Sequence, residues 1–399
     1  MSTRLFHISF ALAGFLTLGL DVFGAQPPDT LWTRSDFGDS VHASMIMEIE
    51  DGHFLMAGYV NKPHGEFSEI WLAKTDSLGK SEWTKSFGGN AGMSPNVIKR
   101  TSDGGYIIGG ASSILNHWVA SGGDSSYEGD AAITPNAFLL KTNAQGDSLW
   151  FRIYRDGSTC ADVQQTTDGG YIFTGDTWLP SHVYLVRTDS NGDTLWTKIY
   201  EEPDTYQGTG VIQTRNGDFV ISADLRIGPG FWTRLIRTDA QGNVLWTRTY
   251  DYCRCAPLLQ IADGGFLVAG TLPGRTALGD RGYFHLVRTN SSGDTLWTRT
   301  LYESTGQMLS SIKPTGDRGY FLVGKGESEM EFGWSMAAAK VDAEGHHLWT
   351  KKLRGCRGGH SWRDGCQTRD GGFIILDTTQ QGPYLVRLKA EDSTTPENH

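Results

Sequence analysis

A tryptophan recurs along this chain at a fixed distance from the basic residue before it. At six places a Lys or Arg that ends one apolar run lies nine residues before a Trp: Lys74 and Trp83, Lys141 and Trp150, Arg187 and Trp196, Arg237 and Trp246, Arg288 and Trp297, and Lys340 and Trp349. A seventh pair is divided between the chain ends, with Arg387 near the C-terminus and Trp32 near the N-terminus. Because this repeat is completed only when the two ends meet, it predicts a closed ring and not an open stack.

Each unit also carries a turn signal followed by an aromatic residue. The seven copies stand at 51–54 (DGHF), 103–106 (DGGY), 168–171 (DGGY), 216–219 (NGDF), 263–266 (DGGF), 317–320 (DRGY) and 370–373 (DGGF). Asp-Gly and Asn-Gly tolerate the positive φ of a tight hairpin, and the aromatic starts an apolar strand. A third strand, a short polar turn and the Trp strand follow. Four short antiparallel strands in a unit of about 50 residues are typical of a β-propeller blade.

The markers therefore predict an all-β, seven-bladed β-propeller of four-stranded antiparallel blades. The Trp strand around Trp32 precedes every hairpin marker, whereas no Trp strand follows the last unit at 370–387. We expect the N-terminal strand to complete the last blade and close the ring, which removes an exposed sheet edge. We interpret the repeated Trp as core between blades, and the repeated Lys or Arg as structural, because a residue present in every blade cannot mark one site.

The two ends of the chain have different compositions from the repeats. Residues 1–25 have the pattern of a secretory signal: Arg4, an apolar run at 8–20, and small residues before Gln26. We assign 26–390 to the propeller and expect the polar tail at 391–399 to be disordered. No later stretch reaches the roughly 20 apolar residues of a membrane span. We expect a secreted monomer, extracellular or periplasmic, without a membrane span.

Charge and cysteine content narrow the partners. A net charge of -10 argues against nucleic acid, because phosphate binding needs clustered Lys and Arg. The five Cys residues are an odd number, so at least one has no partner within the chain. We expect a disulfide between Cys356 and Cys366, since export permits oxidation. Zinc is the alternative for the Cys253-Arg254-Cys255 pair, but no His stands beside it. We assign no metal and no cofactor.

The stretch 185–196 (LVRTDSNGDTLW), repeated at 235–246 and 286–297, resembles two groups of propellers. One is the secreted bacterial proteins with tandem DGGY…KTD..GD..W units, some of which carry an endoglucanase label. The other is the quinoprotein-like repeat. The resemblance implies a propeller over nearly the whole chain, and the label implies action on β-glucan. Quinoprotein enzymes use pyrroloquinoline quinone and calcium, typically in eight blades. Seven blades, and cysteines separated by Arg254, depart from that pattern, whereas cofactor-free scaffolds of the group remain compatible.

Spacing indicates which face carries function. From the turn marker to the following basic residue the chain runs 17 residues from Asp370 to Arg387 but 38 from Asp103 to Lys141. Variable loops on a rigid scaffold are where function is usually fitted. The longest insertion runs from Ala111 to Asn136, and its Gly and Ser residues favour a flap over one blade.

The candidate site residues come from these variable segments. Carboxylates and a His are expected to provide catalysis: Glu202, Asp204, Glu303, His360 and Asp364. Off-repeat aromatic and basic residues are expected to hold substrate: His42, Trp118, Trp178, Arg254, Arg357, Trp362 and Arg363. Two carboxylates about 5 to 10 Å apart suit glycoside hydrolysis. A His among Arg side chains suits proton abstraction beside a uronate carboxylate. The structural alternative is a solvated acidic rim with aromatics that simply pack.

The function expected from these residues is action on an extracellular polysaccharide, with β-glucan hydrolysis as the leading hypothesis. The alternatives are a non-catalytic glycan- or protein-binding scaffold and a polysaccharide lyase. Turns such as 189–193 (DSNGD) are similar to a calcium loop, but the Gly falls between the second and third ligand positions and no downstream bidentate Glu follows. A plain connecting turn is favoured there.

Overall fold

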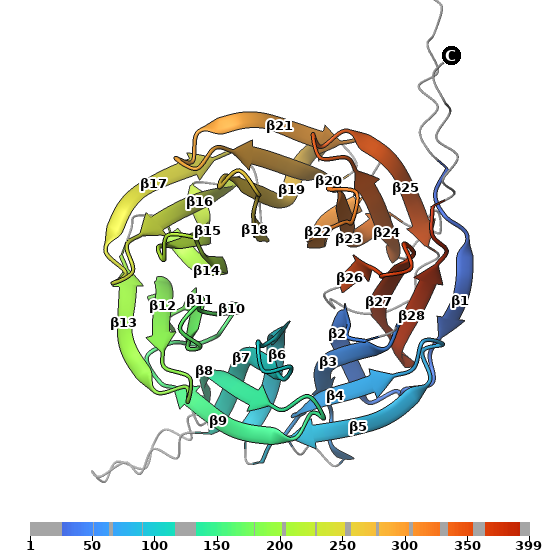
Figure 1. Cartoon of the computed structure of the whole chain (residues 1–399), viewed down its shortest axis with the longest axis horizontal. Helices are drawn as coiled ribbons and strands as arrows, with labels where there is room; N and C mark the ends of the chain where they lie inside the picture. Colours follow the sequence, from blue (N-terminus) through green and yellow to red (C-terminus); the bar gives the residue numbers. More distant parts are fainter. Residues whose placement is uncertain are drawn as a thin grey trace, which may run out of the picture.

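The computed structural model describes residues 26–50, 52–63, 67–89, 91–115, 133–178, 180–201, 205–227, 230–251, 257–276, 279–302, 306–327, 334–353 and 364–391. Over these residues the regular structure is entirely β and forms seven four-stranded antiparallel sheets arranged around a central axis (Figure 1). The predicted seven-bladed β-propeller is therefore confirmed. The predicted signal segment at 1–25 lies outside the described residues, as does most of the predicted tail. No helix in the described part of the chain is long and apolar enough to cross a membrane.

The strands of each blade run from the centre of the ring outward in chain order. Blades 1 to 6 are formed by β2 (Val41–Glu48), β3 (Phe54–Val60), β4 (Glu69–Thr75) and β5 (Ser81–Phe87); β6 (Ala91–Arg100), β7 (Tyr106–Leu115), β8 (Ile133–Thr142) and β9 (Ser148–Tyr154); β10 (Asp162–Gln165), β11 (Tyr171–Asp176), β12 (Val183–Thr188) and β13 (Thr194–Tyr200); β14 (Thr205–Gln213), β15 (Phe219–Ile227), β16 (Gly230–Thr238) and β17 (Val244–Tyr250); β18 (Leu258–Gln260), β19 (Phe266–Thr276), β20 (Gly279–Thr289) and β21 (Thr295–Leu301); and β22 (Gly306–Pro314), β23 (Tyr320–Glu327), β24 (Trp334–Val341) and β25 (His347–Leu353).

Blade 7 joins the two ends of the chain. It contains β26 (Asp364–Gln367), β27 (Phe373–Thr379), β28 (Gly382–Leu388) and, as its outermost strand, β1 (Thr30–Arg34). β1 pairs antiparallel with β28 and places Trp32 opposite Arg387. This register is the one that Trp196 and Arg187 have within blade 3. The split seventh pair is thus a true copy of the repeat, and the predicted closure by the N-terminal strand is confirmed.

The repeated Trp joins each blade to the next. Trp150 of blade 2 lies edge-on to Tyr171, the marker aromatic of blade 3, with ring centroids 5.7 Å apart. Trp32 contacts Phe54 across the closure in the same way, with centroids 6.4 Å apart. Aromatic pairs at such distances add specific geometry to the free energy of apolar burial. The prediction that the repeated Trp residues form inter-blade core is confirmed.

In blades 2 to 7 the repeated basic residue holds the hairpin turn of its own blade. Lys141 donates to Asp103 at 2.8 Å, and Lys340 donates to Asp317 at 2.5 Å. Arg187 contacts Asp168 in the same arrangement. Each cation is buried, while each aspartate is half-exposed at the turn. The structural interpretation of the repeated Lys or Arg is therefore confirmed.

One hairpin turn has no glycine at the second marker position. The second marker residue takes a positive φ, for example 82° at Gly104 and 87° at Gly169. In blade 6 this position is Arg318, which takes a φ of 70°. A side chain with a Cβ is strained in this left-handed region, whereas glycine is not. Blade 6 therefore carries local backbone strain that the other described markers avoid.

Glutamine and glutamate side chains at the ends of the innermost strands tie neighbouring blades together. Gln165 accepts the backbone N–H of Ser102 at 2.8 Å, and Glu48 accepts that of Arg369 at 2.8 Å. Gln213 and Gln367 accept N–H groups at the equivalent places of their neighbours. Each acceptor satisfies a turn N–H of the preceding blade, which fixes the blades against one another.

Two sequence-based expectations need correction. The segment from Ala111 to Asn136 does not begin as a loop, because β7 and β8 continue their ladder up to the pair Leu115 and Ile133. Only residues 116–132 remain for the predicted flap, and they lie outside the described residues. The predicted Cys356–Cys366 disulfide is wrong, since Cys366 is a free thiol on the innermost strand β26, opposite Ile374. Burial raises the pKa of this thiol to about 11. Cys253 and Cys255 lie outside the described residues.

Candidate functional site

The antiparallel order of each blade separates two faces of the ring. Connections between the first and second strands and between the third and fourth strands lie on one face, here called the turn face. Connections between the second and third strands, and from each blade to the next, lie on the opposite loop face. The variable spacings of the sequence all fall on the loop face. This face is therefore where a site is expected.

The calcium-like turns of the turn face close on themselves. Asp189 accepts the N–H groups of Asn191 at 2.8 Å and of Asp193 at 2.9 Å through one carboxylate oxygen. Asp76, Asp239 and Asn290 accept N–H groups at the same two positions of their own turns. A capping side chain of this kind is a normal way to stabilise a turn. These contacts favour the plain connecting turn over a calcium loop.

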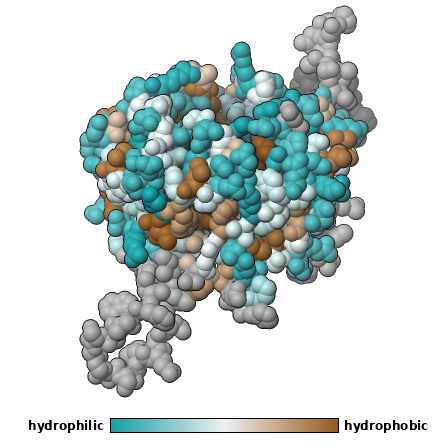
Figure 2. Space-filling view, turned by 60° about the horizontal axis from the view of Figure 1, so that its bottom comes forward, coloured by the Kyte–Doolittle hydropathy of each residue, from teal (hydrophilic) through white to brown (hydrophobic). Residues whose placement is uncertain are grey.

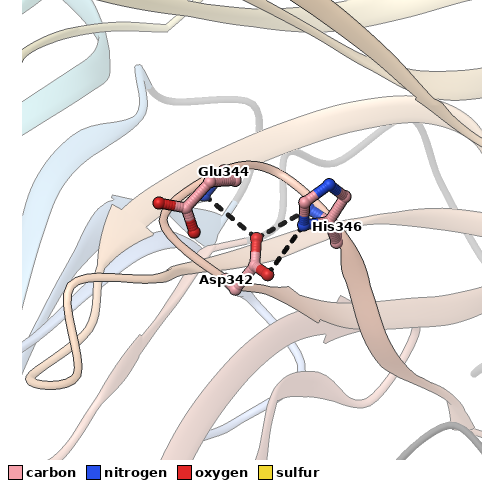
Figure 3. Close-up of side chains that lie close together, drawn as sticks. All are labelled: Asp342, Glu344 and His346. Atoms are coloured by element: carbon pink, nitrogen blue, oxygen red, sulfur yellow. Dashed lines mark hydrogen bonds and ion pairs between the residues drawn. The ribbon is translucent and has the colours of Figure 1, made fainter.

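The equivalent turn of blade 6 brings three possible metal ligands together. Asp342, Glu344 and His346 place ligand atoms within 4.8 Å of one another (Figure 3). Asp342 Oδ1 accepts the N–H groups of Glu344 at 3.0 Å and His346 at 2.8 Å, and its Oδ2 contacts His346 Nδ1 at 2.9 Å. The turn has the capping contacts of the other blades with a His added. The cluster is thus accounted for by turn closure.

Three of the twelve predicted site residues lie in the described part of the chain: His42, Trp178 and Asp364. The other nine lie outside it, so their roles stay predictions: Glu202, Asp204, Glu303 and His360 for catalysis, and Trp118, Arg254, Arg357, Trp362 and Arg363 for binding. His42, Trp178 and Asp364 come from different blades, and within the described residues no contact joins any two of them.

Asp364 is buried at the start of β26 and joins three blades. It accepts the backbone N–H of Ile46 from blade 1 at 3.1 Å and the hydroxyl of Ser311 from blade 6 at 2.5 Å. Lys313 of blade 6 approaches it at 3.7 Å, and this carboxylate raises the pKa of Lys313. These contacts give Asp364 a structural role at the junction of blades 6, 7 and 1.

Asp162 repeats this arrangement in blade 3. It accepts the backbone N–H of Val211 from blade 4 at 3.0 Å and pairs with Lys99 of blade 2 at 2.6 Å. Asp162 and Asp364 thus receive an N–H from the next blade and an ammonium from the preceding one. Because two blades share this pattern, it marks a way to join inner strands and not a single reactive carboxylate.

His42 lies near the loop-face end of β2 and stacks on Tyr59 of β3. The ring centroids are 4.7 Å apart and the planes are inclined by 19°. Burial lowers the pKa of His42, so the imidazole is neutral at neutral pH. A neutral ring stacked on tyrosine is part of an apolar wall. It is less suited to binding an anionic substrate than to packing.

Exposed aromatic side chains gather on the loop face. Trp178, Tyr206 and Tyr302 are 52%, 53% and 64% exposed, and each lies in or beside a loop-face connection. The strongly exposed aliphatic side chains lie instead on the outermost strands and on a turn-face turn: Leu31, Leu78, Leu149, Leu195, Ile199, Val244, Leu245 and Leu296. On the face shown in Figure 2, hydrophobic areas form small separate groups on a mostly hydrophilic surface. Only the loop face therefore presents exposed aromatic rings in the described part of the chain.

Sequence reasoning identified Trp178 but missed Asp176, two residues earlier. Asp176 ends β11 on the loop face, half-buried, with the hydroxyls of Ser158 and Ser181 beside its carboxyl group. Burial raises the pKa of Asp176 despite these hydroxyls. A carboxyl group with a raised pKa is a functional-site candidate. Its position was readable in the sequence, directly after the glycine of the second strand, but its burial was not.

Comparison with known proteins adds no functional assignment. No family model matches the sequence, and no curated protein matches it. Among solved structures, the chain is similar to a protein of unknown function from Bacteroides caccae, at 13% identity and a TM-score of 0.46. That match covers 76% of this chain and 93% of the other.

Proposed function

We propose that this seven-bladed propeller is an exported protein that binds extracellular polysaccharide through its loop face. The observation that carries the proposal is the gathering of exposed aromatic side chains, Trp178, Tyr206 and Tyr302, on that one face. Exposure of an aromatic ring to water is unfavourable, and aromatic residues are enriched where proteins bind a partner. A sugar ring offers them an apolar C–H face, while its hydroxyls reach polar neighbours. Export rests on the signal pattern at 1–25.

Asp364 is the one predicted catalytic carboxylate in the described residues, and its contacts favour a binding protein over an enzyme. Asp364 is already occupied by Ile46, Ser311 and Gly365. A carboxylate with these fixed donors has little freedom to exchange a proton with substrate. We therefore favour the non-catalytic glycan-binding protein over the hydrolase.

Hydrolysis of β-glucan is the second candidate, and Asp176 favours it. A half-buried carboxyl group with a raised pKa is what a glycosidase uses as general acid. A second carboxylate would still be required as base or nucleophile. The predicted Glu202 and Asp204 are close in sequence to Tyr206 and remain the candidates for that role.

Both candidates are tested by one experiment on the purified protein. A panel of neutral and acidic polysaccharides is screened for binding by affinity electrophoresis and for products by reducing-end and unsaturated-product assays. We expect binding to a β-glucan. Binding without products supports the binding protein, new reducing ends support the hydrolase, and unsaturated products support a lyase. If no polysaccharide in the panel is bound or cleaved, the proposal is wrong.

A further inference from the structure

The junction of blades 3 and 4 carries an acid and two exposed aromatic residues on the loop face. Asp176 ends β11, and Trp178 and Ser181 belong to the loop that leads to β12. Tyr206 is the second residue of β14, the innermost strand of blade 4. Ser181 Oγ donates to the backbone oxygen of Tyr206 at 2.5 Å and lies 3.4 Å from Asp176 Oδ2. One hydroxyl therefore connects the carboxyl group of blade 3 to blade 4.

The loop that carries Trp178 is held by its own hydrogen bonds. Thr177 receives the N–H of His182 on its hydroxyl at 3.1 Å and donates this hydroxyl to the oxygen of Pro180 at 2.6 Å. Its backbone N–H donates to His182 O at 3.0 Å. At the base, the N–H of Ser158 donates to Asp176 O at 2.7 Å. Such preorganisation reduces the entropy that binding would otherwise cost.

Other aromatic groups on the loop face are already paired with rings. Tyr302 lies edge-on to Tyr283 with centroids 5.1 Å apart, and His42 stacks on Tyr59. Within the described residues, neither Trp178 nor Tyr206 has such a ring partner, although each is about half exposed. The junction of blades 3 and 4 is therefore where aromatic surface is available to a ligand.

The chemistry of the junction selects a class of sugar. An indole face packs against the axial C–H groups of a pyranose, and a carboxylate accepts hydrogen bonds from adjacent hydroxyls. A negative charge at Asp176 would repel the carboxylate of a uronic acid at short range. The ligand that fits is a neutral hexopyranose within a glucan chain.

From this arrangement we infer that Asp176, Trp178 and Tyr206 form a single subsite for a neutral pyranose ring at the boundary of blades 3 and 4. The inference rests on the proposed polysaccharide function and assigns it a place and a ligand class. Ser181 is a positioning residue, since it joins Asp176 to the strand that carries Tyr206. The raised pKa of Asp176 agrees with its sheltered place beside the loop.

The test compares four variants by isothermal titration with a soluble β-1,4-gluco-oligosaccharide and an oligogalacturonate of equal length. Trp178→Ala is expected to weaken binding of the neutral oligosaccharide about tenfold, and Trp178→Phe to restore part of the loss because it keeps an aromatic face. Asp176→Asn is expected to weaken binding of the neutral oligosaccharide and to reduce the ratio of its affinity to that of the oligogalacturonate. The matched control is Leu195→Ala, which shortens an equally exposed apolar side chain on the outermost strand β13, away from the loop-face connections, with unchanged affinity. Equal thermal unfolding temperatures confirm that the exposed substitutions leave the fold intact.

The outcomes separate the subsite from the wider proposal. If the wild-type protein binds neither oligosaccharide nor any polysaccharide of the panel, the proposed function fails and the subsite with it. If the wild-type protein binds but Trp178→Ala binds equally well, or Leu195→Ala loses as much affinity as Trp178→Ala, only the subsite is wrong. Tighter binding of the uronate than of the neutral sugar also overturns it.

Discussion

The ion pair between Lys141 and Asp103 in the hairpin of blade 2 leads to a prediction in which loss of the two partners has unequal effects on stability. Lys141 is only 4% exposed, whereas its partner Asp103 is 53% exposed. Lys141 Nζ donates to Asp103 Oδ2 and to Thr142 O, each at 2.8 Å. Asp103→Asn leaves a buried ammonium without its counter-charge. Lys141→Met removes that charge, places an apolar chain of similar length in the buried space, and leaves a carboxylate that water can solvate.

The magnitudes follow from this difference in burial. Removing one partner of a fully buried ion pair costs about 3 to 5 kcal/mol. Solvent reaches Asp103 and the Thr142 oxygen still accepts from Lys141, so we expect about 2 kcal/mol for Asp103→Asn. Replacing a buried charge by an apolar isostere is close to neutral, and we expect about 0 to 1 kcal/mol for Lys141→Met. The double variant should be about as stable as Lys141→Met alone.

Urea unfolding measures these differences as shifts in midpoint at constant m-value. The control is Asp193→Asn, which breaks the Arg152–Asp193 pair at 3.1 Å between side chains that are 40% and 66% exposed and should cost under about 0.5 kcal/mol. The reasoning is refuted if Lys141→Met is as destabilising as Asp103→Asn, or if the double variant shows the sum of both losses.

Four further outcomes are expected. Burial raises the pKa of Asp103, but hydrogen bonds from Lys141, Thr101 and the Gly105 N–H outweigh it and lower this pKa from 3.8 to about 2. The extra stability of the wild-type protein over Asp103→Asn should therefore be present above pH 4. It should disappear toward pH 2, as measured by urea titrations at each pH. Arg318→Gly should raise the free energy of unfolding by about 1 kcal/mol, because it relieves the φ of 70°, and a loss of stability would contradict this. Trp349→Ala should lower the free energy of unfolding by about 3 to 5 kcal/mol, since this indole is 1% exposed. Trp32→Ala should lower it clearly less, and equal denaturation midpoints for the two variants would contradict this. Cys366→Ser should leave the number of thiols titrated in the native protein by an aromatic disulfide reagent unchanged, because burial raises the pKa of Cys366 to about 11.

The accuracy of the sequence-based predictions varied with the range of the interactions involved. The pairing of Trp196 with Arg187 depends on a short turn that its own residues close, so its register was readable from nine residues of spacing. The free Cys366 was not readable from the sequence, because neither the expected export nor the spacing of the cysteines shows that Cys366 lies on an innermost strand. Trp178 was found as an aromatic outside the repeat. Asp176 was missed, since an isolated Asp has no pattern and its importance comes from burial.

By itself, the sequence determined the number of blades, the order of their strands and the closure by β1. These features follow from the turn residues and from the apolar pattern that is repeated seven times, and each of these signals involves residues that are close in sequence. Only the tertiary structure decided which polar side chains join blades and which remain available to a ligand. Asp364 meets Ile46 from 318 positions away, and Ser181 meets Tyr206 from the next blade. Such contacts depend on how the blades pack, because burial and hydrogen-bond partners are properties of the assembled ring.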